Sequence, residues 1–597
     1  MIRILLQLLF LPIRLVYFLY CRLRNLSRPG PLMHHRIPGH FTMFQSGGML
    51  SLVVPGDDVH FVEYAQFLRL VADSKHIKTF AYSIGPVSFG LAETEQIGQM
   101  LARIARSGKK LIAHSEGGNL RTLYLLSMAD ERYAAPAADF QSFFPASEPH
   151  YLKGLLQKAG VRVETYAAGR YKSAGEMFSR NNPSSDARKN LEELIQSLRT
   201  SISQVLDRVK LKSNKPFSRL LIEQSLWSAA QLISIGFLRE ELTESALIKR
   251  LQNKQDEPIK HALSETQPEQ PVASPGTQPT DGKEIKLTSD TKLIGFHKRA
   301  RYPLIRFRRV RSIAVVSMEG AISAGSHGDT VKSGLINGNA YRDIIEQLKD
   351  SHEDAVILCI NSPGGTPDGS EMIYQAIMEL KEKKPVIAFM TGVAASGGYY
   401  IASAAHKVYS LETTLTGSIG VVRIQPDARG LYKKLGVETT RIGFDRTQDI
   451  MSLTGPLSGD SRKLLKEQLT STYDTFLDRV AKGRKQDKKT VHRFAEGKVW
   501  SGHDFLGTGL MDGITDIVSL LEILKELLGY KTGTPLKLEL YPEVKVDVRS
   551  LVSGKLPFSA QLNSILAPLS SNVEEFSRLN LTVPLVYTAL PLAIRVR

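Results

Sequence analysis

A serine and a lysine in different halves of this 597-residue chain could together cleave an acyl bond. Ser396 stands in the run Ala394–Tyr400 (AASGGYY), and Lys172 stands in Gly169–Ala174 (GRYKSA). A serine hydroxyl is a poor nucleophile until a base takes its proton. A lysine can be that base when burial lowers the pKa of its ammonium group, and the tyrosines and alanines around Lys172 are apolar enough to allow it.

The same sequence frame occurs twice along the chain. Trp227 and Trp500 mark equivalent points of the two copies, and so do Ser127 and Ser403. A repeat of this length, in a chain too long for a single hydrophobic core, predicts two related domains.

Each copy of the repeat lacks one member of the pair. In the register that aligns the two serines of the frame, Leu120 falls opposite Ser396 and Gln448 falls opposite Lys172. Leucine cannot act as a nucleophile, and glutamine cannot act as a base. The sequence therefore predicts a divided site, with the base from the first half and the nucleophile from the second.

Three further residues could complete such a site. Ser396 begins the helix expected over residues 396–405, so the N–H of Gly397 lies in its first turn, at the positive end of the helix dipole. Gly365 closes the turn Asn361–Gly365 (NSPGG) after an apolar strand, where parallel sheets form their ligand-binding loops. We expect both glycines to supply N–H groups to an oxyanion hole, and the hydroxyl of Ser418 to hold the lysine amine in line.

Each motif also has a purely structural interpretation. Taken alone, Lys172 would be a surface lysine, and Ala-Ser-Gly-Gly would be a tight turn between a strand and a helix. His406 and His503 are the alternative bases, but neither has an obvious carboxylate to orient it. No cluster with metal-ligand spacing and no phosphate-binding loop is evident, so we expect neither a metal nor a cofactor.

The net charge of +17 does not indicate nucleic-acid binding. The excess lies in two segments without acidic residues, one ending at Arg36 and one over residues 298–311, and the rest of the chain is nearly balanced. A nucleic-acid-binding fold would instead carry a basic stripe across its surface. The two cysteines, Cys21 and Cys359, exclude a disulfide framework, and Cys359 is expected to be a buried apolar residue.

Apolar runs of strand length alternate with helical stretches in both halves. The expected strands are 50–54, 78–82 and 110–113 in the first half and 313–316, 355–360 and 385–389 in the second, with helices over 92–105 and 371–382. Continuous apolar strands are typical of parallel sheets covered on both faces. We predict an α/β fold of two tandem domains, each a layered, largely parallel sheet with flanking helices.

The chain divides into five expected segments. They are residues 1–40 as a membrane-anchor segment, 41–252 as the N-terminal repeat, 253–311 as a disordered Pro-rich linker with a basic cluster, 312–530 as the C-terminal repeat, and 531–597 as a C-terminal extension. The apolar N-terminus with its arginines describes a helix lying in a membrane interface. A single membrane span and a removed signal segment are the alternatives.

Four motifs, NSPGG, AASGGYY, GRYKSA and Thr416–Gly420 (TGSIG), together resemble the long, tandem-domain form of signal peptide peptidase A, also called protease IV. The resemblance extends more distantly to the Clp-protease and crotonase fold. It implies a membrane-associated serine endopeptidase that degrades cleaved signal peptides and other small hydrophobic peptides. It also implies Ser396 as nucleophile, Lys172 as general base and Ser418 as the residue that orients the lysine.

The same resemblance implies a homotetramer closed around an apolar chamber, in contact with membrane lipid. The expected location is the bacterial cell membrane, with a peripheral or single-pass N-terminal anchor. Two other functions use this fold. A crotonase-like acyl-CoA enzyme would need carboxylates at the site and would not use Ser396, and a catalytically silent membrane scaffold would not need the serine or the lysine.

Overall fold

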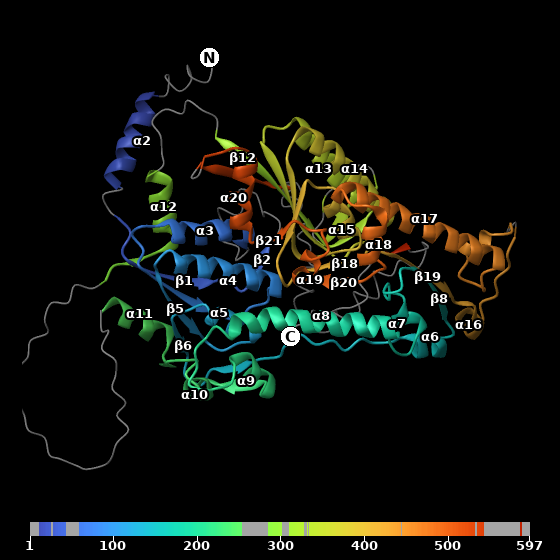
Figure 1. Ribbon diagram of the computed structural model, residues 1–597, viewed down its shortest axis with the longest axis horizontal. Coiled ribbons are helices and arrows are strands. Elements are labelled where there is room, and N and C mark those ends of the chain that lie inside the picture. Colours follow the sequence, from blue (N-terminus) through green and yellow to red (C-terminus); the bar gives the residue numbers. More distant parts are fainter. Residues whose placement is uncertain are drawn as a thin grey trace, which may run out of the picture.

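Two mainly parallel sheets form the centres of two α/β halves (Figure 1). The computed structural model describes residues 11–24, 28–42, 59–253, 285–300, 310–326, 331, 334–442, 445–531, 534–542 and 586–587. Helices lie against both sheets, and the predicted class of two tandem α/β domains is confirmed.

The first half is built on a six-stranded sheet in which every pairing is parallel. Its strands in spatial order are β10 (Glu240–Glu241), β6 (Glu131–Ala134), β5 (Lys110–Ser115), β4 (Thr79–Ile84), β1 (Leu32–Ile37) and β11 (Leu287–Thr288). Its helices are α3 (Phe61–Asp73), α4 (Leu91–Arg106), α5 (Leu120–Leu126), α6 (Lys153–Ala159), α7 (Glu176–Ser179), α8 (Ser185–Leu206), α9 (Phe217–Glu223), α10 (Ala229–Ser234), α11 (Glu244–Gln252) and α12 (Asp290–Ala300). The apolar runs at 78–82 and 110–113 form β4 and β5 as predicted, and the helix expected over 92–105 is α4.

The second half repeats this plan on an eight-stranded sheet. Its main path is β20 (Val499–Ser501), β18 (Leu415–Gly417), β16 (Val386–Ala395), β15 (Ala355–Ser362), β12 (Arg311–Glu319) and β22 (Leu536–Tyr541), and β17 (Lys407–Ser410) and β21 (Gly513–Ile514) branch from β16. Its helices are α13 (Gly338–Asp350), α14 (Pro367–Lys383), α15 (Gly397–Ser403), α16 (Arg429–Lys434), α17 (Gly459–Arg484), α18 (Lys488–Phe494), α19 (Gly502–Leu506) and α20 (Ile517–Leu527). The three strands and the helix predicted here are present. Cys359 is buried within β15, as expected.

Antiparallel strand pairs show the repeat and link its copies. Trp227 pairs across β7 (Asp139–Gln141) and β9 (Leu226–Ser228), and Trp500 pairs across β18 and β20, both in antiparallel register. β8 (Arg162–Ala168) of the first half runs antiparallel to β19 (Val421–Asp427) of the second, with Ala168 opposite Val421. The remaining strands are β2 (Phe41–Thr42), β3 (Val59–His60), β13 (Ala321–Ser323), β14 (Leu335–Asn337) and β23 (Val586–Tyr587).

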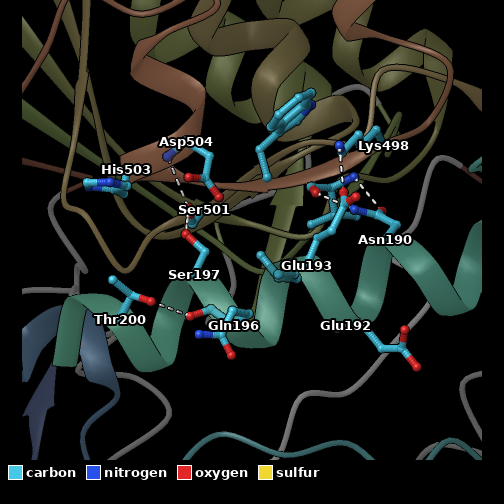
Figure 2. A pocket seen from close by; sticks show the side chains of 13 residues that line it. Asn190, Glu192, Glu193, Gln196, Ser197, Thr200, Lys498, Ser501, His503 and Asp504 are labelled. Atoms are coloured by element: carbon cyan, nitrogen blue, oxygen red, sulfur yellow. Dashed lines mark hydrogen bonds and ion pairs between the residues drawn. The ribbon is translucent and has the colours of Figure 1, made fainter. Parts of the chain in front are cut away.

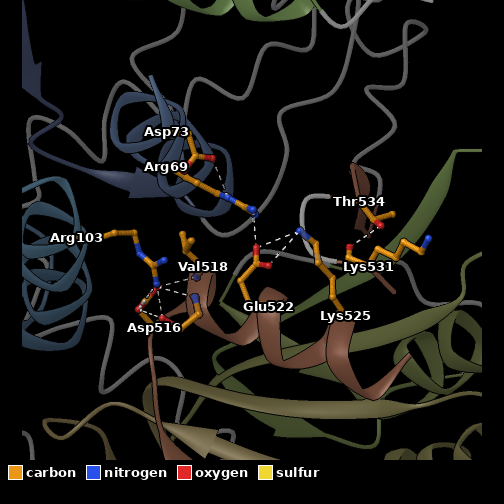
Figure 3. A network of polar contacts seen from close by, with 10 residues as sticks. Arg69, Asp73, Arg103, Asp516, Val518, Glu522, Lys525, Lys531 and Thr534 are labelled. Carbon is orange, nitrogen blue, oxygen red and sulfur yellow. Dashed lines mark hydrogen bonds and ion pairs between the residues drawn. The ribbon is translucent and has the colours of Figure 1, made fainter. Parts of the chain in front are cut away.

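The two halves share one hydrophobic core and a set of polar contacts. One continuous cluster of buried apolar side chains includes residues of β4 and β5 together with residues of β12, β15 and α20. The long helix α8 of the first half runs beside the second half and contacts β20 (Figure 1). On another side of the interface, Arg69 of α3 pairs with Glu522, and Arg103 of α4 contacts Asp516 and Ser519 near the start of α20 (Figure 3).

The sheets extend beyond the repeat boundaries expected from sequence. β1 lies within the expected anchor segment 1–40, β11 lies within the expected linker, and β22 lies within the expected C-terminal extension. The rest of these segments is described only in part. The apolar run 50–54, residues 254–284 of the linker, residues 301–309 of the basic cluster and residues 543–585 of the extension lie outside the described residues.

Candidate active site

The backbone at Ser396 differs from an ordinary helix start. The residue ends β16 and precedes α15 with φ 57° and ψ −118°, a conformation that L-residues rarely adopt. Its N–H donates to the Gly417 carbonyl at 2.8 Å, which fixes the turn. Its side chain makes no capping bond to the helix, so the hydroxyl points away from α15 and is left for another partner.

Lys172 reaches that hydroxyl from the other half of the chain. It follows β8, and the pairing of β8 with β19 brings the end of β8 beside Val421, three residues after Ser418. The Nζ atom of Lys172 lies 2.9 Å from Oγ of Ser396. The structure thus brings together the two side chains that the sequence analysis paired.

The surroundings of Lys172 favour an uncharged amine. The residue is 4% exposed, and burial lowers the pKa of its ammonium group to about 7. No opposing charge offsets this effect, because desolvation is its one cause. A lysine in this setting is neutral in a large fraction of molecules at physiological pH, as a general base must be.

Ser418 occupies the remaining bonding positions of the amine. Its carbonyl oxygen and its Oγ both lie 3.0 Å from Nζ of Lys172. A neutral amine has two N–H donors and one lone pair, so it can donate to both oxygens of Ser418 and accept from the hydroxyl of Ser396. Ser418 is fully buried and has φ 51°, and its N–H donates to the Lys498 carbonyl at 2.6 Å.

The two glycines expected in an oxyanion hole lie next to each other. A Cβ atom added to Gly397 would meet the backbone N of Gly365 at 3.1 Å and Oγ of Ser370 at 2.6 Å. Gly365 in turn packs on the Ile322 backbone, where a Cβ would lie 1.9 Å from the carbonyl oxygen. Both positions therefore require glycine, because neighbouring backbone and buried side-chain atoms fill the space that a side chain would need.

The structure corrects the residue opposite the serine in the first copy of the repeat. The N-cap of α5 is Asn119, whereas the N-cap of α15 is Ser396, so the structural counterpart of the serine is Asn119 rather than Leu120. The side chain of Asn119 accepts from the N–H groups of Arg121 and Thr122. In the first half this position is thus used to cap a helix.

The residue opposite the lysine in the second copy also differs from the prediction. Ser184 and Ser458 begin the equivalent helices α8 and α17, and their N–H groups donate to Glu176 and Asp449 respectively. Counted back from the carboxylates, the lysine position falls on Asp445, and counted back from the serines it falls on Arg446, so neither count returns Gln448. The alignment failed because the segment between strand and helix is longer in the second half and contains α16.

Neither candidate histidine base lies at the serine. His406 accepts a hydrogen bond from the N–H of Val386, at the start of β16, whereas Ser396 follows the end of this ten-residue strand. His503 lines a cavity between α8 and β20, and Ser396 is not among the residues that line this cavity (Figure 2).

One cavity borders the site, and a larger one lies between the two halves. The first, of about 310 Å³, lies beside Gly397 and is lined by α14, α15 and α17, including Ser370, Tyr400 and Phe476. The other, of about 570 Å³, lies between α8 and β20 (Figure 2). His352, Glu353 and Glu539, which line neither cavity, place ligating atoms within 4.8 Å of one another, but Lys537 also pairs with Glu539, as in an ion-pair cluster.

Comparison with known proteins identifies the family of this chain. The model of Peptidase family S49 matches residues 103–256 and 378–531, and the Clp protease model matches residues 331–416. Protease 4 of Haemophilus influenzae is 29% identical over 452 residues, which cover 73% of this chain and 68% of that protein. The chloroplastic serine protease SPPA of Arabidopsis thaliana is 28% identical over 533 residues, which cover 89% of this chain and 71% of that protein.

A shorter relative matches part of the chain. The putative signal peptide peptidase SppA of Enterococcus faecium is 32% identical over 260 residues, which cover 42% of this chain and 74% of that protein. Fold and family together define a serine peptidase built on tandem Clp-protease-like domains. The chain belongs to Peptidase family S49, whose model covers one segment in each half.

Proposed function

We propose that the chain is a membrane-associated serine endopeptidase in which Ser396 is the nucleophile and Lys172 is the general base. The observation that carries the proposal is the 2.9 Å contact between Nζ and Oγ in a buried site. Removal of the hydroxyl proton is the step that a serine cannot perform alone. The lowered pKa of Lys172 supports its role in that step.

The reaction follows the usual two stages of acyl transfer. The neutral amine takes the proton of Ser396 as Oγ bonds to the peptide carbonyl carbon. The resulting ammonium then gives this proton to the leaving amine as the C–N bond breaks, which leaves an acyl ester on the serine. Water, deprotonated by the same amine, attacks the ester, and the serine recovers its proton as the peptide acid leaves.

Gly365 and Gly397 are proposed to donate to the oxyanion formed in each stage. Their close packing supports this role, because it keeps both stretches of backbone in place before substrate binds. Ser418 is proposed to hold the amine along the line towards Ser396 through its two contacts with Nζ.

Cleaved signal peptides and other small hydrophobic peptides are the proposed substrates. The cavity beside Gly397 has room for one side chain of a peptide, and its wall includes Val421, Tyr400 and Phe476. The family assignment and the name of the relative from Enterococcus faecium support this class of substrate.

Helix α2 (Leu11–Arg24) supports a peripheral membrane contact. Ile13, Val16 and Leu23 on this helix are each more than two-thirds exposed, and arginines stand in its last turn. An apolar face with basic residues is suited to the interface of an anionic bilayer. Among the described residues, no helix is long and apolar enough to cross a membrane.

A homotetrameric ring is the proposed assembly. The segment after β19 exposes four apolar side chains, Leu435, Val437, Ile442 and Met451, and a neighbouring copy would cover them. Light scattering of the detergent-solubilised protein tests this point, because a fully active monomer would contradict it.

The catalytic proposal is tested with short Leu/Ala-rich peptides and detergent-solubilised protein. Ser396→Ala and Lys172→Ala should each lower kcat by about a thousandfold or more, because nucleophile and base act as a unit. Ser418→Ala should lower it less. Lys109→Met is the matched control, since Lys109 is also buried but bonds to Ala72 and Ser107 instead. Hydrolysis by Lys172→Ala at neutral pH would refute the dyad.

A further inference from the structure

The turn formed by residues 495–498, called here the 495–498 turn, lies against the backbone of Lys172. Gly497 has φ +77°, and a Cβ atom added there would lie 2.6 Å from both N and Cβ of Lys172 and 2.7 Å from its Cα. Two of these three atoms are backbone, so a change of side-chain rotamer cannot relieve the clash. Gly497 therefore packs against the backbone and Cβ of Lys172, which a side-chain rotation cannot displace.

Hydrogen bonds from the same turn hold the two segments that meet at the amine. The Glu496 carbonyl accepts from the N–H of Tyr171, the residue before the lysine, at 2.8 Å. The N–H of Gly497 donates to Ile419 at 2.8 Å, and the Lys498 carbonyl accepts from Ser418 at 2.6 Å. One short turn of the second half thus fixes both Lys172 and Ser418.

Side chains around the turn hold its own conformation. Glu496 has φ +52°, which is unfavourable for a residue with a side chain. Its N–H donates to the hydroxyl of Tyr473 at 3.1 Å, and its carboxylate pairs with Arg170 at 3.2 Å. A backbone in this conformation persists only when its surroundings fix it.

The first half also holds the turn from its outer side. Nζ of Lys498 lies 2.8 Å from Oε2 of Glu193 on α8 and 4.1 Å from the centre of the Trp500 ring (Figure 2). Asn190 of α8 accepts from the N–H of Val499 and donates to its carbonyl, at 2.9 and 2.8 Å. The turn is therefore enclosed between α8 and the lysine loop, both of which belong to the first half.

We propose that the 495–498 turn positions the general base, with Gly497 setting how far Lys172 lies from Ser396. None of its residues touches the reacting atoms, so the turn acts through the lysine and through Ser418. This inference rests on the proposed function of Lys172 as base. A displacement of about 1 Å at a catalytic group can cost about a hundredfold in rate, so small movements of the turn are expected to matter.

Gly497→Ala is the direct test. Its matched control is Gly529→Ala, because Gly529 also has positive φ (+65°) but no atom within 4 Å of the added Cβ. An alanine at either position has an unfavourable positive φ, but only the Cβ of Gly497→Ala clashes with Lys172. We expect Gly497→Ala to lower kcat by about a hundredfold with KM within about twofold, whereas Gly529→Ala keeps the wild-type kcat.

The pH profile separates positioning from a general loss of structure. Displacing the lysine admits water to its amine, so the rising limb of kcat against pH should move to higher pH in Gly497→Ala. A merely structural role would lower the amount of folded enzyme without moving that limb. The thermal midpoint is measured alongside, so that activity is counted per folded molecule.

A second variant decides the question if Gly497→Ala does not fold. Lys498→Met removes the contact with Glu193 but leaves the turn backbone intact, and it should lower kcat several-fold with the same shift of the limb. Lys488→Met, which removes a surface ion pair on the neighbouring helix α18, is its control. If Gly497→Ala or Lys498→Met folds and keeps both the wild-type kcat and the wild-type position of the rising limb of kcat against pH, the proposed role of the turn is wrong. Hydrolysis by Lys172→Ala would instead overturn the base itself, and with it this inference.

Discussion

The Nζ atom of Lys172 and the Oγ atom of Ser396 lie 2.9 Å apart, although 224 positions separate the two residues in the chain. Neither half of the molecule brings a complete pair. The contact depends on the β8–β19 pairing and on the shared core, so the relative placement of the halves is as important to the site as its residues.

The pH dependence of hydrolysis should report the titration of Lys172. Its buried amine has a pKa of about 7, and only the neutral form can accept the serine proton. We expect kcat/KM to rise with pH and to reach half of its plateau near pH 7. Lys172→Arg should be inactive across the whole range, because a guanidinium does not lose its proton. A rise of kcat/KM centred near pH 10.5, the ordinary lysine pKa, would show that burial does not lower the pKa of Lys172.

Removal of the buried amine should stabilise the protein, and the gain should depend on pH. The folded-state pKa of Lys172 lies below the ordinary value of 10.5, so between pH 7 and 10.5 the unfolded chain binds the extra proton. Wild-type stability therefore rises through this window. Lys172→Met should have the higher thermal midpoint at pH 6, with a difference that shrinks as the pH rises towards 10. A constant difference would show that the amine is not the cause.

The hydrogen bonds of Glu95 across the interface between the halves should contribute more to the free energy of unfolding than the exposed ion pairs do. Its carboxylate on α4 accepts from the N–H groups of Glu412 and Thr413, each at 2.9 Å, and from the Thr413 hydroxyl at 2.7 Å. Glu95→Ala leaves buried donors without partners and should lower the free energy of unfolding by about 2–4 kcal/mol in urea titrations.

Arg69→Ala is the comparison for that measurement. It removes a partly exposed pair with Glu522 and should cost less than about 1 kcal/mol. Equal losses in the two variants would show that buried hydrogen bonds and exposed ion pairs contribute alike at this interface.

The apolar face of α2 should govern membrane binding. Ile13→Glu and Val16→Glu place charge on the most exposed part of this face, and flotation with vesicles containing anionic lipid should show reduced binding. Leu155→Glu, at an exposed leucine on α6, is the control and should leave binding unchanged. Peptide hydrolysis in detergent should persist in all three. If the α2 variants float with vesicles as well as the wild type does, the membrane contact lies outside α2.

Much of the architecture could be predicted from local patterns. Runs of buried apolar residues, such as those of β15 and β16, are the direct consequence of a sheet covered on both faces, and they were assigned correctly. The pairing of Lys172 with Ser396 could also be predicted, because each copy of the repeat lacks the residue type that the other supplies.

Long-range registers could not be predicted in the same way. A single offset cannot follow a segment whose length differs between the copies, and such a segment lies between β8 and α8 and between β19 and α17, where the expected counterpart of Lys172 was placed at Gln448. Strands β1 and β22 could not be predicted because each pairs with strands that are distant in the sequence: β1 lies between β4 and β11, and β22 is the edge strand beside β12. The importance of Gly497 is invisible in sequence, because it arises from contact with a residue of the other half.

If Lys172 and Ser396 form the proposed dyad, its division between the halves also determines when a newly made chain can first hydrolyse a peptide. Synthesis runs from the N-terminus, so Lys172 leaves the ribosome well before Ser396, and the turn that packs on the lysine follows about a hundred residues after the serine. Until then the amine is solvated, charged and unable to act as a base. On the proposed mechanism, chains that end before the 495–498 turn are expected to be inactive, so hydrolysis is expected only in molecules whose synthesis has passed that turn.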